Sequence, residues 1–283
     1  MNFNTFMLNF INQITEKKQM RIYVFYLCTF VGNLYGNLPE RTSASDVDSY
    51  REYCLEAAKD EFLFAEFKRA PEYTQILEHL GRCTGVPYLS IIKEQTPEFL
   101  DAIETFKKND LLGHPRTDFY DETGTISTTT IRYMKVASDL TKLFGSLDNK
   151  SIIEIGGGYG GQCLILSYLY KFKNYTIVDL PEPLALTKKY LERHNILNVI
   201  YKTFDEAITD GSFDLVISNY AYVECVPEMR KKYAQEILSH SKRGYLTGPK
   251  EEAAGYLDEF GVAYEELPEI PLTSPNNIIV VWR

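Results

Sequence analysis

The segment SIIEIGGGYGGQ, residues Ser151–Gln162, decides the fold that the rest of the chain follows. Its apolar first half is typical of a buried strand, and its glycines indicate a tight turn into a helix that begins near residue 161. Because glycine has no Cβ, the backbone at Gly156, Gly158 and Gly160 can approach a ligand closely. We therefore predict that a nucleotide-like cofactor binds at this turn, beside the N-terminus of the following helix.

Two classes of cofactor bind at such a turn, and the glycines alone do not separate them. Gly156, Gly158 and Gly161 also fit the G-x-G-x-x-G pattern of dinucleotide-binding enzymes. Glu154 stands two residues earlier, where its carboxylate would repel a pyrophosphate but attract the sulfonium and ammonium groups of S-adenosylmethionine. The sequence favours S-adenosylmethionine, with an NAD(P)-dependent oxidoreductase as the alternative. The spacing Glu154-x-Gly156-x-Gly158-x-Gly160 resembles motif I of the Rossmann-like methyltransferases.

Length, composition and charge set bounds on the function. With 283 residues, 45% of them hydrophobic, the chain can bury a large core as one large domain or two small ones. The net charge of −9 and the pI near 5.1 argue against a nucleic-acid partner. Five scattered cysteines without a C-x-x-C pair predict reduced thiols in a cytoplasmic protein. The apolar run at residues 22–31 is too short to span a bilayer, so we expect a buried helix or strand there and no membrane insertion.

The first part of the chain has helical periodicity. Apolar residues recur at three- and four-residue spacing from Ser45 to about Lys108, and Pro71–Leu80 and Pro97–Phe106 are predicted as separate short helices. A polar, glycine-bearing segment follows at Asn109–Thr125, and Ser127–Phe144 is predicted as one long amphipathic helix. We therefore divide the chain near residue 120, into an α-helical cap or substrate region (1–120) and a cofactor-binding domain (121–283).

After residue 145, short β-rich runs alternate with helical ones, as in a parallel, doubly wound sheet. The predicted strands are 151–155, 175–179, 199–202, 213–218 and 244–247, and the predicted helices are 161–170, 182–194 and 228–239. The end of the chain is predicted as a hairpin of two strands, 262–268 and 278–282. Five parallel strands closed by a C-terminal hairpin resemble the class I methyltransferase fold, so we expect a Rossmann-like α/β domain preceded by helices.

Residues at the strand ends are candidates for binding the cofactor. Asp179 follows the second strand, where a carboxylate can accept hydrogen bonds from both ribose hydroxyls, although it could instead cap the next helix. Phe204 and Asp205 follow the third strand, where they could contact the adenine, or Asp205 could cap a short helix. Asp179-Leu180-Pro181 is similar to the Asp-Leu-Pro motif of small-molecule O-methyltransferases, which adds Leu180 to the candidates.

Two further regions supply charged or polar candidates. Arg132, on the long helix before the first strand, could bind the methionine carboxylate or lie solvated on the helix surface. The fourth strand should deliver its last residues to the methyl group, so we expect cofactor and acceptor contacts from Asn219, Tyr220, Tyr222 and Glu224. The alternative is that both tyrosines belong to the core and that Glu224 is a surface charge.

Four blocks of the chain, between Asn109 and Leu246, are similar to those of a family of sugar O-methyltransferases. They are Asn109-Asp110-x-x-Gly113-x-Pro115 with Tyr120, Gly124-x-Ile126-Ser127-x-Thr129-Thr130-x-Arg132-Tyr133, residues 156–162, and residues 218–221. The resemblance implies transfer of a methyl group to a hydroxyl of a sugar, nucleotide sugar or glycan, with Tyr120 near the acceptor. The chain departs from the family pattern at Thr128 and His114. A non-catalytic methyltransferase-like module is a further alternative.

A hydroxyl is a poor nucleophile at neutral pH, so the reaction needs a base. His114 has the most suitable ordinary pKa, and Glu224 or Asp110 could serve if burial raises theirs. The other histidines, His79, His194 and His240, lie in amphipathic helical patterns and are interpreted as ordinary surface or boundary residues. No compact set of metal ligands is visible, although aspartates such as Asp110 could hold a divalent ion.

Overall fold

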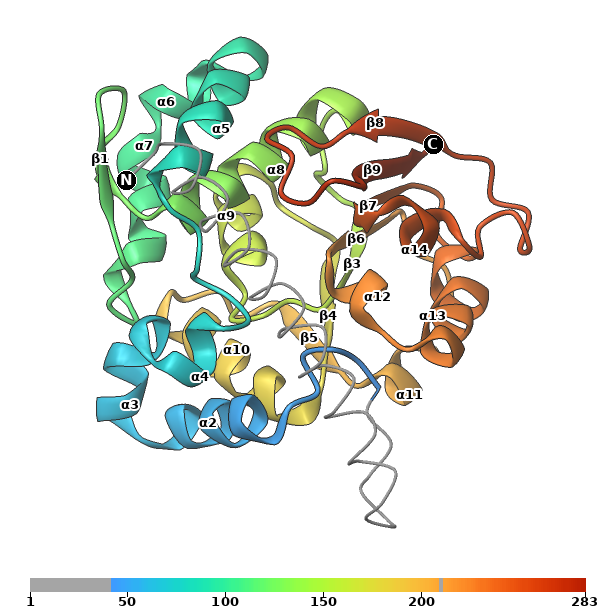
Figure 1. The fold of residues 1–283 in the computed structure, drawn as a ribbon, viewed down its shortest axis with the longest axis horizontal. Helices are drawn as coiled ribbons and strands as arrows, with labels where there is room; N and C mark the ends of the chain where they lie inside the picture. The colour runs from blue at the N-terminus through green and yellow to red at the C-terminus, as the bar shows by residue number, and fades with distance from the viewer. Residues whose placement is uncertain (1–41, 209–210) are drawn as a thin grey trace, which may run out of the picture. The chain divides into compact units, whose positions relative to one another are not determined.

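The central sheet of the protein has seven strands in the order β5-β4-β3-β6-β7-β9-β8 (Figure 1). The computed structural model describes residues 42–208 and 211–283; the apolar run at residues 22–31 lies outside this part. The strands are β3 (Ser151–Ile155), β4 (Asn174–Val178), β5 (Val199–Lys202), β6 (Leu215–Asn219), β7 (Gly244–Pro249), β8 (Glu265–Pro268) and β9 (Asn277–Trp282).

The first five of these strands are parallel, and the C-terminal hairpin closes the sheet. Ile153 of β3 pairs with Thr176 of β4 on one side and with Val216 of β6 on the other. β9 runs antiparallel to both β7 and β8. The chain leaves β3 toward β4 and later returns to the other side of β3 as β6, so the strand order reverses there. In an open α/β sheet, such a reversal leaves a crevice at the carboxyl ends of the strands, where ligands bind.

Both faces of the sheet are covered, because neighbouring residues of a strand point to opposite faces. Ile152 belongs to a core with α8 (Thr128–Phe144), α9 (Gly161–Leu169) and α10 (Pro181–Arg193). Ile153 belongs to a second core on the other face. There it packs with the following elements: α11 (Phe204–Ala207), α12 (Ala221–Glu224), α13 (Pro227–Tyr233), the π-helix η3 (Ala234–Leu238) and α14 (Lys250–Ala254).

The predicted fold class, a class I Rossmann-like methyltransferase sheet with helices before it, is confirmed. The bounds of β3 and β5 coincide with the predicted ones, and β4, β6 and β9 differ from them by one or two residues. The predicted helix 228–239 changes from α13 to a π-helix at Ala234. A helix predicted over Ser127–Phe144 is found as α8, with Ser127 as its N-cap.

The helices before β3 are shorter than predicted. They are α2 (Asp48–Lys59), α3 (Glu61–Glu66), η1 (Phe67–Arg69), α4 (Pro71–Thr74), α5 (Arg82–Gln95), α6 (Glu98–Asp101), α7 (Ile103–Phe106) and η2 (Lys107–Leu111). The helix predicted from Pro71 ends at Thr74, because Glu78 has a φ of 62° that no helix permits. Ala102 divides the helix predicted over residues 97–106.

A hairpin lies in the segment that was predicted to be a loop. It consists of β1 (Asp118–Tyr120) and β2 (Gly124–Ile126), with Phe119 opposite Thr125. Residues 42–283 pack as one unit, and α2 lies along α10 of the sheet region (Figure 1). The functional division at residue 120 therefore stays a proposal.

A buried polar cluster around Asn109 joins the N-terminal helices to the sheet region. The Asn109 amide donates hydrogen bonds to Thr130 Oγ1 (2.7 Å) and Tyr159 OH (3.0 Å). Tyr190 OH donates to the carbonyl and side-chain oxygens of Asn109, at 2.8 and 2.9 Å. Lys68, 1% exposed, donates to the same carbonyl at 2.6 Å, and burial lowers the pKa of its ammonium group to about 8. The backbone carbonyl and the side chain of Asn109 thus bind partners from four segments of the chain: η1, α8, the turn after β3, and α10.

We expect Asn109→Ala to lower the free energy of unfolding by about 2–4 kcal/mol, because it leaves buried hydroxyl groups without partners. Chemical denaturation monitored by circular dichroism measures this change. Asn198→Ala, at an exposed position, is the matched control and should stay within about 0.5 kcal/mol of the wild type. Equal stability of the two variants would mean that the cluster does not hold the two regions together.

Candidate active site

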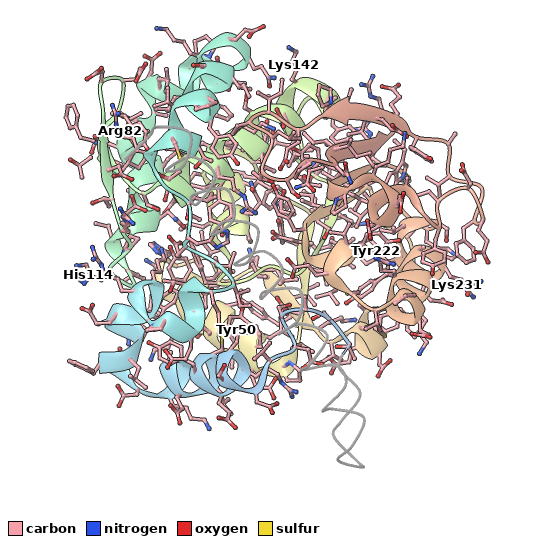
Figure 2. The ribbon with its side chains drawn as sticks, in the orientation of Figure 1. Tyr50, Arg82, His114, Lys142, Tyr222 and Lys231 are labelled. Carbon is pink, nitrogen blue, oxygen red and sulfur yellow. The ribbon has the colours of Figure 1, made fainter. Side chains whose placement is uncertain are left out.

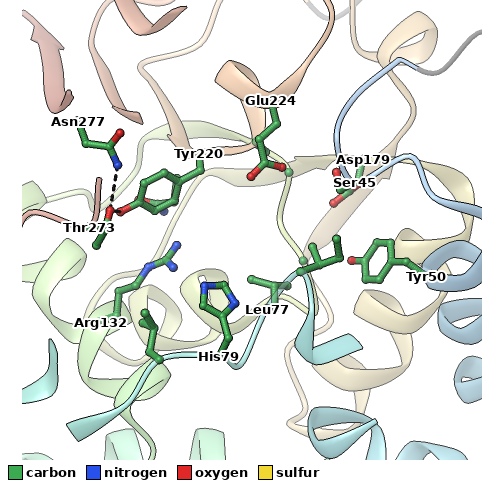
Figure 3. Close-up of a pocket in the computed structure, with 16 residues that line it drawn as sticks. Ser45, Tyr50, Leu77, His79, Arg132, Asp179, Tyr220, Glu224, Thr273 and Asn277 are labelled. Carbon is green, nitrogen blue, oxygen red and sulfur yellow. Dashed lines mark hydrogen bonds between the residues drawn. The ribbon is translucent and has the colours of Figure 1, made fainter. Parts of the chain in front are cut away.

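A cleft of about 280 Å³ opens at the carboxyl ends of β3, β4 and β6 (Figure 3). This volume is near the lower end of the range for small-molecule sites, about 300–1,000 Å³. The sheet side contributes Gly156, Gly158, Asp179, Asn219 and Tyr220. The opposite wall comes from the N-terminal region, and its members include Ser45, Tyr50, Leu77 and His79. The cleft therefore lies where the sheet reverses its strand order, as the sequence predicts.

The glycines of the turn after β3 have different surroundings. Gly156 and Gly158 line the cleft with φ values of 73° and 55°. A Cβ on Gly158 would lie 2.6 Å from Leu77 Cδ1, so the segment above the turn leaves no room for a side chain. Gly160, with a φ of 90°, is the N-cap of α9, and a Cβ there would lie 2.9 Å from Leu191 Cγ of α10. Helix packing thus explains Gly160, which does not line the cleft.

Glu154, which was predicted to attract the cofactor, is directed into the protein. Its side chain is 3% exposed and accepts a hydrogen bond from Tyr175 OH at 2.7 Å. Burial raises the pKa of its carboxyl group to about 7; the Tyr175 hydrogen bond opposes this shift and the charge of Asp179 adds to it. Glu154 does not line the cleft. Glu154 therefore connects β3 to the neighbouring strand β4 through Tyr175 and makes no contact in the cleft.

Asp179 presents a carboxylate to the cleft directly after β4. Its Oδ1 accepts a hydrogen bond from the backbone N–H of Leu180 at 2.8 Å. Burial raises the pKa of Asp179 to about 6, while the N–H groups of Leu180 and Gly158 lower it and Glu224 raises it further. Leu180, rather than Asp179, is the N-cap residue of α10. In the described part of the chain no cation pairs with Asp179, so its carboxylate can still accept hydrogen bonds from a ligand.

Arg132 presents a guanidinium group to the same cleft from α8. The ring of Tyr220 covers it, with 4.9 Å between the guanidinium carbon and the ring centroid. Tyr220 has a φ of 72°, and its hydroxyl donates to Glu269 and lies 3.1 Å from Thr273 Oγ1. Arg132 forms no ion pair or hydrogen bond with any residue that the structure describes. Its five N–H donors are therefore free for an anionic group of a ligand.

Besides Asp179, two groups able to accept a proton line the cleft, and they lie on opposite sides of it (Figure 3). Glu224 follows the fourth parallel strand, as predicted, and burial raises the pKa of its carboxyl group while Arg132 opposes that shift. His79 is exposed, as predicted for a surface or boundary residue, and it also lines the cleft; partial burial of its ring and then the charge of Arg132 lower its pKa. The amphipathic pattern gave no signal for this position, because the turn at Glu78 replaces the predicted helix.

Two of the three predicted bases lie away from the cleft. His114 is exposed at the edge of the molecule, with its Nδ1 2.7 Å from Glu66 Oε2 (Figure 2). Asp110 accepts hydrogen bonds from Ser127 N (2.7 Å) and Thr130 Oγ1 (2.6 Å), so its carboxylate fixes the N-terminus of α8. Burial raises the pKa of Asp110, and these two hydrogen bonds lower it. Of the three predicted bases, the cleft holds only Glu224.

The remaining predicted contacts also lie outside the cleft. Tyr120 is buried against Gly85 and its hydroxyl lies 2.6 Å from Thr128 Oγ1. Tyr222 is fully buried in the core beside Tyr233. The ring of Phe204 also packs on Tyr233, with 4.6 Å between ring centroids. Asp205 is exposed in the first turn of α11, where Thr203 and Glu206 form the capping box. The structure thus gives all four a packing or surface position.

The described part of the chain comprises residues 42–208 and 211–283. This part contains no group of three His, Cys, Asp or Glu side chains placed to hold a metal ion. None of its helices combines the length and the apolar character that crossing a bilayer requires.

Comparison with known proteins shows a methyltransferase domain in the sheet region of the chain. Residues 153–246, which include β3, β4, β5 and β6, match the family described as "Methyltransferase domain". A comparison with curated proteins gave no significant match. The family match and the cleft at the ends of these strands indicate S-adenosylmethionine as the cofactor. The chain therefore carries an S-adenosylmethionine-dependent methyltransferase domain, which favours a methyltransferase over the NAD(P)-dependent alternative.

Several solved structures are similar to about half of the chain. They include a ribosomal protein L11 methylase from Lactobacillus delbrueckii subsp. bulgaricus (15% identity, 54% of this chain, 79% of that chain, TM-score 0.42). SMU.1697c from Streptococcus mutans, crystallised with SAH, has 17% identity over 53% of this chain and 96% of that chain, with a TM-score of 0.41. A methyltransferase from Pyrococcus furiosus has 18% identity over 52% and 80%, with a TM-score of 0.40. Because the identities are below 25% and the TM-scores below 0.5, the ligands and substrates of these proteins say nothing about those of this chain.

We expect Glu154→Gln to become more stable than the wild type as the pH rises. The carboxyl group has a pKa of about 7 in the folded protein, above its ordinary 4.5. Its contribution to the free energy of unfolding is therefore fully present below pH 4.5 and falls as the pH rises toward and through 7, because the unfolded chain loses this proton first. The amide cannot ionise and still accepts from Tyr175. The difference in free energy of unfolding should therefore grow by about 2–3 kcal/mol between pH 4 and pH 8.

Urea denaturation across this pH range measures the difference. Glu94→Gln removes a negative charge from an exposed position of α5 and is the control for the change in net charge. A pH-independent difference for Glu154→Gln would contradict the burial of an ionisable carboxyl group at this position.

Proposed function

We propose that this protein transfers a methyl group from S-adenosylmethionine to a hydroxyl group of a small molecule, specifically a sugar or nucleotide sugar. The observation that carries the proposal is the pair of opposite charges in one cleft, the carboxylate of Asp179 and the guanidinium of Arg132, neither of which has a counter-ion among the described residues. The methyltransferase domain supplies the sheet side of that cleft, including Asp179. Free cysteines and the acidic pI support action in the cytoplasm.

The residues in the cleft fit the functional groups of the cofactor. Asp179 would accept hydrogen bonds from the ribose hydroxyls, and the cofactor would contact the backbone at Gly156 and Gly158, which line the cleft. Arg132 would bind the methionine carboxylate, for which a planar guanidinium is well suited. Asp179 and Glu224 together make one side of the cleft negative, which favours the ammonium and sulfonium groups. The cofactor, when bound, supplies a methyl group that is already activated toward nucleophiles.

The acceptor side of the cleft favours a ligand that donates hydrogen bonds. Thr273, in the loop between β8 and β9, and Asn277, the first residue of β9, belong to the lining, and Asn277 donates to Thr273 Oγ1 at 2.9 Å. Thr273 Oγ1 in turn donates to Glu269, so it must accept from the amide nitrogen of Asn277. Asn277 Oδ1 is left buried without a partner, which costs about 1–3 kcal/mol unless a donor reaches it. A sugar hydroxyl supplies such a donor.

Charge favours an uncharged sugar over a nucleotide sugar. Among the described residues that line the cleft, Arg132 is the one permanently charged cation. If Arg132 binds the methionine carboxylate, no fixed positive charge is left for a phosphate of the acceptor, and Glu224 would repel one. The hydroxyl proton must leave during the reaction, and a base in the cleft is therefore required.

The first test is cofactor binding. Isothermal titration calorimetry should show S-adenosylhomocysteine binding to the wild type and not NAD⁺. Asp179→Asn should weaken this binding by about 1–3 kcal/mol, or about 5- to 150-fold in Kd, because it replaces charge-assisted hydrogen bonds to the ribose. Asp101→Asn, an exposed aspartate of α6, is the matched control and should leave the Kd unchanged. Unchanged affinity of Asp179→Asn would remove this residue from the cofactor site.

The second test concerns the acceptor. The protein is incubated with S-adenosylmethionine carrying a labelled methyl group and with separate pools of neutral monosaccharides and cyclitols, nucleotide sugars, amines and unfolded protein. We expect label in the neutral sugar pool, as a methyl ether. At a cofactor concentration below the Kd of both proteins, the Asp179→Asn variant should incorporate about 5- to 150-fold less label. Transfer only to amines or to protein would contradict a hydroxyl acceptor while leaving the methyltransferase activity intact.

A further inference from the structure

In the segment Ile76–Leu80, every residue except Glu78 lines the cleft. After α4 ends at Thr74, Glu78 adopts a φ of 62°. Its carboxyl group is 7% exposed, on the side of the buried cluster that holds Lys68. Its neighbours Leu77 and His79 line the cleft. A non-glycine residue at positive φ is strained by about 1–3 kcal/mol, and such strain is concentrated at functional sites.

His79 differs from the other three histidines of the chain in having no partner. His114 pairs with Glu66, His194 stacks on Tyr190 with 4.7 Å between ring centroids, and His240 Nδ1 lies 3.2 Å from Ser239 Oγ. Within the described part of the chain, neither ring nitrogen of His79 forms a hydrogen bond or ion pair. Figure 3 shows its ring directed into the cleft beside Arg132, on the side opposite Glu224.

We propose that His79 is the general base of the reaction: it takes the proton of the acceptor hydroxyl during methyl transfer. This inference rests on the proposed function. As the acceptor oxygen forms its bond to the methyl carbon, the carbon–sulfur bond breaks and its electron pair stays on sulfur. The hydroxyl proton passes to a ring nitrogen of His79, and the imidazolium then releases it to solvent. The products are the methyl ether and S-adenosylhomocysteine, so atoms and charge balance.

The surroundings of His79 favour a neutral ring. Partial burial of the ring, and then the positive charge of Arg132 on α8, lower the pKa of His79 below its ordinary 6.5, while the residue keeps contact with solvent. The carboxylates that face the cleft from other elements are Asp179, after β4, and Glu224, on α12. Tyr220, after β6, and Tyr50, on α2, complete the titratable lining. At pH 7 the imidazole is therefore available to accept a proton.

Glu224 is better placed to interact with the cofactor than to remove the proton. It lies close enough to Asp179 for its charge to raise the pKa of that residue, and Asp179 is the residue proposed to bind the ribose. A carboxylate in that position attracts the sulfonium and ammonium groups of the cofactor. Their positive charge lowers the pKa of the carboxyl group, which makes the carboxylate a weaker base. His79 stands on the other side of the cleft, where the acceptor can lie between the imidazole and the methyl group.

Proton NMR of the four histidine C2–H signals tests the proposal without an acceptor. The protein is titrated between pH 4.5 and 8.5 in complex with S-adenosylmethionine and, separately, with S-adenosylhomocysteine. The two ligands differ by one methyl group and one positive charge at sulfur. If His79 faces the methyl group, its pKa should be lower in the S-adenosylmethionine complex, by on the order of one pH unit. His114, His194 and His240 serve as internal controls and should titrate alike in both complexes.

His79→Gln assigns the His79 signal by its disappearance, and calorimetry with S-adenosylhomocysteine shows whether this variant keeps the folded cofactor site. Its Kd should match the wild type, whereas Glu224→Gln should lose affinity for S-adenosylmethionine more than for S-adenosylhomocysteine. In the labelled-methyl assay, His79→Gln should lower kcat about 10²–10⁴-fold. If both ligands bind and the pKa of His79 is the same in the two complexes, His79 is not the base. If neither ligand binds, the proposed function itself fails.

Discussion

The turn between β3 and α9 is the constraint on which the rest of the structure depends. A Cβ at Gly156 would overlap the side chain of Ala221 in α12, and one at Gly157 would overlap Ile177 of β4. At Gly158 the obstacle is Leu77, and at Gly160 it is Leu191 of α10. Elements from both faces of the sheet, and from the N-terminal region, therefore meet on backbone that carries no side chains. The glycine pattern is required for this packing as much as for any ligand.

The sheet region could be predicted because apolar residues recur there with the period of a helix, about 3.6 residues, or form short β-rich runs, and turn residues separate these runs. The N-terminal region was harder, because its helices are interrupted by local backbone geometry. Neither the positive φ of Glu78 nor the break at Ala102 has a glycine or proline to mark it. The same limit applies to the site: Asp179, Asn219 and Glu224 were predicted because they follow strands of a recognisable sheet. His79 and Asn277 come from segments whose position depends on tertiary contacts alone.

Several conspicuous sequence features turn out to serve packing. Asn109 and Asp110 stand together in a polar block, yet their hydrogen bonds go to Tyr190, Thr130 and the N-terminus of α8. Glu154 bonds to Tyr175 on the neighbouring strand. A buried polar side chain must be satisfied, and a sequence pattern does not reveal whether the partner is a ligand or another part of the chain. Burial and partner identity, which only the structure supplies, separate the two cases.

The buried cluster and the cleft share one short segment, and this links stability to function. Glu78 is held on the side of Lys68, whose ammonium group bonds to Asn109, while Leu77 and His79 form the wall of the cleft. Any shift of Glu78 must therefore move His79 relative to Arg132 and Glu224. The N-terminal helices are consequently part of the site: they fix a histidine opposite the strand ends, at a position that the sheet alone could not supply.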